Sequence, residues 1–464
     1  MTAVAALLAG LFAVAGPRVL VGYQALTGYP EPHTPRQYNR TFYLRYSTGS
    51  QPDTILVLMP GVFLGATAFD GLARQLVAQA PRVEVWAVDR RSNQLEVRNV
   101  SREALQMNDA SPAYRYFVTR AGRAGGFQPA AAGKLRFMSH WGLDTHLQDL
   151  HRVVLAARKR AKRVIVGGHS LGASVASLYA AAKIEPGRTG QEFVDGLLLL
   201  DGLVGRTGGG AGADIARAIS DLETGKTDVY NAAVTRYLTE REARNLMALT
   251  APDALAPADF VAFPASNLAV AGLYESANTS PLPLLSSTVG EAIGARLTSA
   301  PRPAGSVLRI APGLRNLAGL DAGARRIDWR TAAAGDQPVD LRAYLRSDVQ
   351  PAADFGEWYF PSRLTLDLTS VTVPFTNLSG FVPNSEVQTP TLIIGAGKGY
   401  MTSPETFAAY AQVRPPQSIA YEVVASYTHM DVLTANRENG VIPLLRRWLD
   451  RLPIQSSVAR RARP

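Results

Sequence analysis

The chain has 464 residues, of which 47% are hydrophobic and 19% are charged, so it can bury a large core and is not a disordered or low-complexity chain. It contains no cysteine, which excludes a disulfide framework, a thiol nucleophile and a cysteine-ligated metal ion. The net charge of +10 comes from scattered arginines with no nucleic-acid-binding motif among them, so we expect no nucleic-acid partner.

Residues 1–15 are apolar and end in Ala13-Val14-Ala15, the small-x-small pattern that signal peptidase needs. The run is too short for a comfortable membrane span. We therefore predict a cleaved signal peptide and a secreted or periplasmic protein. No lysine or arginine precedes the run, so an anchor or a packed helix stays open, as does a cytoplasmic location. Membrane association is expected only through this segment.

Strands and helices then alternate along the chain. Residues 23–38, rich in Pro, Gly and Tyr, suggest an exposed arm, and 41–47 alternate as in an edge strand. The run 54–59 is apolar throughout, as in a strand covered on both faces, and a helix at 69–79 and a strand at 83–88 follow it. This order predicts parallel βαβ units.

A helix at 143–162 leads to a β-branched run that ends in Gly167-Gly168-His169-Ser170-Leu171-Gly172, after which a small-residue helix begins. Gly168, Ser170 and Gly172 match the G-x-S-x-G pattern. They lie between a predicted strand and a predicted helix, the context in which this pattern indicates a nucleophilic serine on a sharp turn. A Cβ at either glycine would collide with the neighbouring strand or helix, and the strained turn exposes the serine hydroxyl.

At this turn the chain resembles the α/β-hydrolase superfamily, in which Gly-His-Ser-Leu-Gly is a common lipase and esterase form. The resemblance implies an α/β core with a mostly parallel sheet and helices on both faces, and it makes Ser170 the nucleophile. It also implies an oxyanion hole formed by the backbone N–H groups of Leu171 and Val62, the latter in Pro60-Gly61-Val62 after the 54–59 strand.

The resembled family orders its catalytic residues as serine, acid, histidine. Of six histidines only His429 lies C-terminal to Ser170, in the loop after a strand at 418–424, and we expect it to be the base. His169, inside the turn, is expected to pack beneath it. His146 and His151 are five residues apart and miss the helical i, i+4 spacing of metal ligands, so we predict no metal site and no cofactor.

The acid is less directly defined. The family usually takes it from the loop after the strand that is here 390–394, but that loop, 395–400, has no carboxylate. A subset of lipases takes it from the end of the preceding strand, where Asp201 follows 193–200. We favour Asp201, with Glu405, Asp431 or a carboxylate of the insertion as alternatives.

After Asp201 the strand–helix alternation stops. Residues 203–388 contain helical patches at 213–222 and 229–249 and Pro-rich connectors, which predict a largely helical cap. The predicted organisation is thus core at 39–202, cap at 203–388, core again at 389–453 and a basic tail at 454–464. Helices at 403–412 and 442–452 complete the core. Apolar residues of the cap suit a lipophilic substrate group or form the cap's own core: Phe260, Phe263, Leu284, Leu285, Trp358, Tyr359, Phe360, Phe375 and Phe381.

Together these features predict a serine hydrolase that cleaves a carboxylic ester, with a small-molecule or lipid-like substrate, through an acyl-enzyme on Ser170. Two alternatives stay open. One is an acyltransferase that uses the same residues but passes the acyl group to an acceptor other than water. The other is a non-catalytic binding protein that has kept the fold. The missing carboxylate at the usual acid loop favours this alternative.

Overall fold

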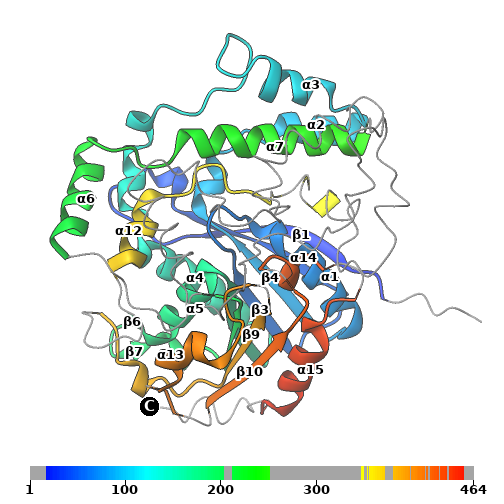
Figure 1. Cartoon of the computed structure of the whole chain (residues 1–464), viewed down its shortest axis with the longest axis vertical. Coiled ribbons are helices and arrows are strands. Elements are labelled where there is room, and N and C mark those ends of the chain that lie inside the picture. The colour runs from blue at the N-terminus through cyan, green and yellow to red at the C-terminus, as the bar shows by residue number, and fades with distance from the viewer. Residues whose placement is uncertain are drawn as a thin grey trace, which may run out of the picture.

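The computed structural model describes residues 17–202, 212–250, 355–370, 380–397, 399–412, 418–427, 429–435 and 438–453, with a few single positions between them. The expected signal peptide, the basic tail and most of the predicted cap lie outside these residues. The described part is a sheet with helices on both faces and a further group of helices beyond one end of the sheet (Figure 1).

The sheet has eight strands in the order β1-β2-β4-β3-β5-β8-β9-β10. β2 is antiparallel to both of its neighbours, and every other pairing in the sheet is parallel. The mostly parallel α/β sheet predicted from the sequence is therefore confirmed. The strands are β1 (Leu20–Thr27), β2 (Arg40–Ser47), β3 (Thr54–Met59), β4 (Val83–Asp89), β5 (Arg163–His169), β8 (Gly196–Leu200), β9 (Thr391–Ala396) and β10 (Ile419–Val424). Two short strands, β6 (Lys183–Glu185) and β7 (Arg188–Thr189), form a separate hairpin.

The first strand corrects two expectations. β1 pairs with β2 from Leu20 opposite Ser47 to Thr27 opposite Arg40, so β1 is the edge strand and the predicted arm begins only after Thr27. Tyr23, expected in the arm, stacks on Phe42 with ring centroids 5.5 Å apart. The reason is local: the turn-forming Gly and Pro residues that the arm was inferred from start at position 28, and the residues before them suit a strand.

Helices cover the sheet on both faces because side chains alternate along each strand. Leu56 and Leu58 of β3 belong to the core under α1 (Asp70–Gln79) and α15 (Val441–Arg451). Ile55 and Val57 of the same strand belong to the core on the other face, under α4 (Leu143–Arg158) and α5 (Leu171–Ala181). Of two shorter helices, α14 (Asp431–Thr434) contributes to the first of these cores and α13 (Ala408–Gln412) to the second.

A third cluster of buried side chains, which we call the outer cluster, lies apart from the sheet. It joins α2 (Asn99–Met107) and α3 (Ser111–Tyr114) to α7 (Ala232–Thr250), which run side by side in Figure 1. The sequence analysis predicted no element between 91 and 142 and assigned those residues to the core of the fold. Large members of the cluster are Phe117, Phe127, Met138, Trp141, Leu238, Leu246, Trp358 and Tyr359.

The predicted helical patches of the insertion correspond to α6 (Gly212–Thr224) and α7, and α12 (Ser362–Ser370) follows the gap in the described residues. Of the apolar residues listed for the cap, Trp358 and Tyr359 are buried in the outer cluster, whereas Phe360 and Phe381 pack in the sheet core. The others, Phe260, Phe263, Leu284, Leu285 and Phe375, lie outside the described residues.

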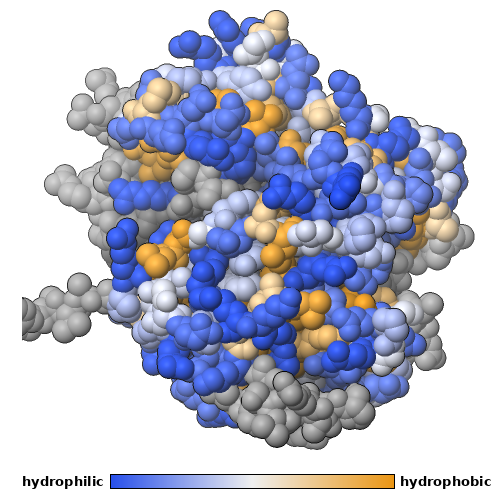
Figure 2. All heavy atoms as spheres, turned by 180° about the vertical axis from the view of Figure 1, so that it is seen from behind, coloured by the Kyte–Doolittle hydropathy of each residue, from blue (hydrophilic) through white to orange (hydrophobic). Residues whose placement is uncertain are grey.

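On the face shown in Figure 2, the described surface is mainly polar. Hydrophobic side chains there form small patches separated by hydrophilic ones. None of the helices in the described ranges is both long and apolar enough to cross a bilayer.

Candidate active site

Ser170 stands in a sharp turn between β5 and α5. Its φ of 57° lies in the left-handed region that non-glycine residues rarely adopt. A Cβ on Gly168 would lie 2.3 Å from backbone atoms of Gly172, and a Cβ on Gly172 would lie 2.0 Å from the carbonyl oxygen of Met59. The glycines of the motif are therefore required by close backbone contacts on both sides of Ser170, and the surrounding structure supports the strained serine.

Asp201 and His429 meet at the carboxyl end of the sheet. Asp201 directly follows β8, which pairs with β5, and His429 follows β10. The Nδ1 atom of His429 donates to the Oδ2 atom of Asp201 at 2.6 Å, and both side chains are buried. This contact fixes the tautomer of His429, because a proton on Nδ1 leaves the lone pair on Nε2.

The loop after β9 wraps the Asp201 carboxylate. Backbone N–H groups of Ala396, Tyr400 and Met401 donate to it at 3.0, 3.0 and 2.8 Å. The Tyr400 ring also packs edge-on against His429, with centroids 4.5 Å apart. The loop that lacks a carboxylate of its own thus supplies hydrogen-bond donors to the carboxylate of the neighbouring strand.

His169 lies beneath the turn, as expected, and also contacts His429. Its Nε2 donates to the backbone oxygen of His429 at 2.9 Å, and the two ring centroids are 4.2 Å apart. Burial, followed by the nearby His429, holds the pKa of His169 well below its usual range, so the ring is neutral. A neutral His169 therefore anchors the backbone of His429 without adding charge beside it.

The loop at residues 60–64, which we call the 60–64 loop, packs directly on Ser170. A Cβ built on Gly61 would lie 3.1 Å from the Cβ of Ser170. Val62, one of the two expected oxyanion donors, is the next residue of this loop. Leu171, the other, is the first residue of α5, where a backbone N–H has no partner inside the helix.

Arg90, at the end of β4, holds the 60–64 loop from beneath. Its guanidinium donates to the carbonyl oxygens of Pro60, of Gly61 at 3.2 Å and of Leu64 at 3.2 Å. It also forms an ion pair of 2.6 Å with Glu357, which accepts a further bond from Ser92. The side chains of Arg90 and Glu357 are 1% and 0% exposed, so the pair is fully removed from water.

The backbone around Glu357 joins the same loop. The N–H of Gly65 donates to the carbonyl of Phe355 at 2.7 Å, and the N–H of Glu357 donates to the carbonyl of Phe63 at 3.0 Å. Sequence reasoning missed Arg90 and Glu357. The only signal was the charged Asp-Arg-Arg at the end of a buried strand, and nothing in the sequence near position 357 indicates its partner.

Two points of the predicted triad remain: the contact between Ser170 and His429, and the alternative acids Glu405 and Asp431. In the part of the chain that the structure describes, no hydrogen bond links the Ser170 hydroxyl to His429, a contact that in hydrolases is often long without substrate. Glu405 is exposed in the 3₁₀ turn Pro404–Phe407, and Asp431 is buried at the start of α14. The carboxylate that contacts His429 is that of Asp201.

The family model described as "Alpha/beta hydrolase family" matches residues 56–292, more than half of the 464 residues. The chain therefore belongs to the alpha/beta hydrolase family. No curated protein matches it.

Three solved structures are similar to this chain over most of its length. A candidate lipase from Sulfolobus solfataricus has 15% identity and a TM-score of 0.46, with 94% of this chain and 95% of that chain covered. A thermophilic esterase from Thermogutta terrifontis has 13% identity and a TM-score of 0.40, with 93% and 99% covered. A haloalkane dehalogenase variant from Bradyrhizobium elkanii has 10% identity and a TM-score of 0.37, with 95% and 99% covered.

Proposed function

We propose that this alpha/beta hydrolase is a serine hydrolase that cleaves carboxylic esters, with Ser170 as nucleophile, His429 as base and Asp201 as the acid that orients it. The observation that carries the proposal is the 2.6 Å contact between buried His429 and Asp201, next to a serine held at a φ of 57°. Strain of this kind persists where a site is built around it.

The proposed reaction has two halves. The Nε2 atom of His429 takes the proton of the Ser170 hydroxyl as its oxygen attacks the ester carbonyl, and the same proton then goes to the leaving alcohol. In the second half water attacks the acyl-enzyme, again with His429 as base. The bond between the acyl carbon and the Ser170 oxygen breaks, His429 returns the proton to that oxygen, and the carboxylic acid leaves. Asp201 stabilises the imidazolium, and the N–H groups of Val62 and Leu171 stabilise the oxyanion of each tetrahedral intermediate.

A lipophilic acyl or alcohol group fits the surroundings of the turn best. Val62, Phe63 and Leu171 are apolar, only partly buried and packed on the sheet core beside Ser170. Phe63 in turn packs edge-on against Phe360, with centroids 5.0 Å apart. A substrate chain that covers these side chains would gain the free energy of removing their exposed apolar area from water.

Labelling by a fluorophosphonate probe tests the proposal. Wild type should label, and Ser170→Ala and His429→Ala should not, while circular dichroism shows all three folded. p-Nitrophenyl esters of rising chain length then measure turnover and the preferred acyl group. If the protein labels but turns over no ester in water, and an added alcohol restores turnover, the protein is an acyltransferase. A wild-type protein that neither labels nor turns over any ester would refute the catalytic proposal and leave a binding protein.

A further inference from the structure

Glu31, His33 and His140 come together on the side of the molecule where the chain leaves β1. Their potential ligand atoms all lie within 4.8 Å of one another, and no other such group of three occurs in the described residues. Glu31 and His33 belong to the arm between β1 and β2, and His140 ends the 3₁₀ segment Ala132–His140 before α4. We propose that these three side chains bind a divalent transition-metal ion of the zinc type, and that the ion links the arm to the start of α4.

The carboxylate of Glu31 is already oriented. It is buried, and its Oε2 atom accepts bonds from the Thr34 hydroxyl at 2.6 Å and from the backbone N–H of His33 at 3.0 Å. The Thr34 oxygen is itself held by the indole N–H of Trp141 at 2.8 Å. Hydrogen bonds of this kind are typical around metal-ligating carboxylates. Among the described residues none reaches Oε1, so this oxygen can bind an ion.

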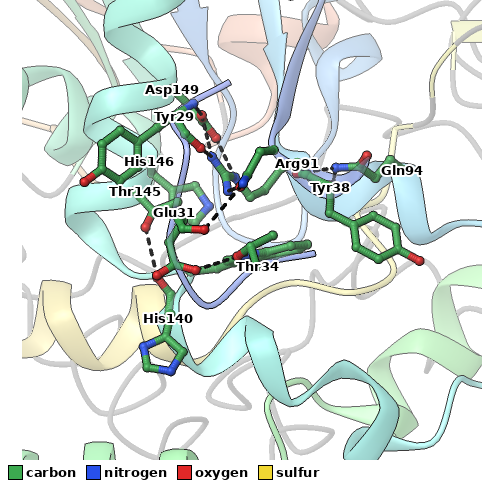
Figure 3. Close-up of polar contacts among 12 residues, drawn as sticks. Tyr29, Glu31, Thr34, Tyr38, Arg91, Gln94, His140, Thr145, His146 and Asp149 are labelled. Carbon is green, nitrogen blue, oxygen red and sulfur yellow. Dashed lines mark hydrogen bonds and ion pairs between the residues drawn. The ribbon is translucent and has the colours of Figure 1, made fainter. Parts of the chain in front are cut away.

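The arm that carries Glu31 and His33 is fixed near both of its ends by one buried ion pair (Figure 3). Arg91 and Asp149 contact each other at 2.6 Å, and Asp149 accepts the N–H of Tyr29 at 2.8 Å. Arg91 also donates to the carbonyl of Tyr29 and to the side chain of Asn39, both at 3.0 Å. The arm is thus held in place independently of any ion. Metal binding therefore does not have to supply the free energy of ordering it.

The segment that carries His140 is fixed as well. The backbone oxygen of His140 accepts the Thr145 hydroxyl of α4 at 2.9 Å, as Figure 3 shows. The rings of His33 and His140 stack with centroids 4.0 Å apart and planes 18° apart, so their nitrogens are close neighbours. Ligand atoms around a tetrahedral zinc ion are about 3.4 Å apart. The exposed ring of His33 can close the remaining distance by rotating about its side-chain bonds.

The donor set selects the class of ion. Two imidazoles and one carboxylate suit zinc and its neighbours in the first transition series, whereas calcium and magnesium require mostly oxygen ligands. With three protein ligands, water completes a tetrahedral shell. The site uses none of the residues of the proposed ester hydrolysis, so its test is independent of that proposal.

The test is titration of the metal-stripped full chain with Zn²⁺ by calorimetry, and with Co²⁺ by visible absorption. We expect one ion per chain with a Kd in the micromolar range or below, and a tetrahedral Co²⁺ spectrum. His33→Asn, in an exposed residue, and Glu31→Gln should each weaken binding at least tenfold. Glu405→Gln, which removes an exposed carboxylate elsewhere, should bind as wild type does.

Two results would overturn the proposal. One is the absence of saturable binding below about 100 times the expected Kd. The other is binding that His33→Asn and Glu31→Gln leave unchanged, which would place the ion on other side chains and make the stacked histidines a packing feature only. Thermal unfolding provides a second readout, because an ion that binds only the folded chain raises Tm. That rise should be absent in both variants and present in Glu405→Gln.

Discussion

The two sides of Ser170 are held by opposite means. On the acid side, Asp201 accepts the backbone N–H groups of Ala396, Tyr400 and Met401, so neutral backbone groups orient a charged side chain. On the other side, the charged Arg90 orients the neutral backbone of the 60–64 loop, and its counter-ion Glu357 is 267 residues away in sequence. One arrangement uses neutral backbone donors, and the other uses a buried ion pair. Both join segments far apart in the sequence, since Asp201 and Ala396 are 195 residues apart.

The ionic side also determines where N–H groups point. In a trans peptide the C=O and the following N–H point in opposite directions. Because Arg90 binds the carbonyl of Gly61, the N–H of Val62 is directed away from Arg90. The same loop packs on the Cβ of Ser170, so this orientation supports Val62 as the oxyanion donor in the proposed mechanism. We therefore expect substitution of Asp201 to lower activity with little loss of stability, and substitution of Glu357 to lower both.

The largest expected effect is that of Asp201→Asn. The three loop N–H groups need an acceptor, so the amide oxygen should face them and its NH₂ should face His429, which favours the wrong tautomer. We expect kcat/KM for a p-nitrophenyl ester to fall about 10³- to 10⁴-fold with little loss of stability. Glu405→Gln, on the exposed alternative acid, is the control and should keep full activity. A fall of less than tenfold in Asp201→Asn would remove this residue from the proposed triad.

Glu357→Gln should lower both stability and activity. It leaves the buried charge of Arg90 without its partner, and we expect the free energy of unfolding to fall by about 3–5 kcal/mol. Misplacement of the Val62 N–H should lower kcat by about 10²-fold, with a smaller change in KM. Urea unfolding and steady-state kinetics measure the two effects.

A double variant separates positioning from stability. Arg90→Met with Glu357→Leu replaces the ion pair by apolar side chains, which often restores stability. Activity should stay low, because methionine cannot bind the carbonyls of the 60–64 loop. If kcat recovers together with stability, the ion pair has only a structural role.

Gly399→Ala tests the acid side by steric means. A Cβ at this position would lie 2.1 Å from Oδ2 of Asp201, the oxygen that contacts His429, so the loop or the carboxylate must shift. We expect stability to fall by about 1–3 kcal/mol, as for other overpacked sites, and kcat to fall with it. Gly133→Ala is the matched control, because its Cβ would meet no atom within 4 Å. Equal activity of the two variants would mean that the loop can move without disturbing Asp201.

Sequence reasoning reached the acid side and missed the side held by the ion pair. The turn at Ser170 and the uniqueness of His429 are visible in short stretches, and Asp201 was favoured from the order of strands, which the pairing of β5 with β8 bears out. Arg90 and Glu357 could not be paired from sequence, because nothing near position 357 indicates the partner and the carbonyls that Arg90 binds have no side-chain signature. The helices at 99–114 were missed because they are short and pack on α7, a contact between distant segments.

The smallest expected effect lies beside the ion pair and depends on pH. His146 is buried with a pKa of about 3, lowered first by burial and then by the charge of Arg90, and its Nδ1–H donates to the carbonyl of Gly142 at 2.6 Å. The unfolded chain binds this proton near pH 6.5 and the folded chain does not, so the folded state loses stability as pH falls from about 6.5 toward 3. The contribution is about 1.4 kcal/mol per pH unit. His146→Asn keeps a donor to Gly142 but cannot titrate, so urea unfolding at pH 7 and pH 5.5 should show a smaller loss in the variant than in wild type. Equal losses would mean that protons bound elsewhere account for the acid sensitivity and that the Arg90 region does not exclude a second positive charge.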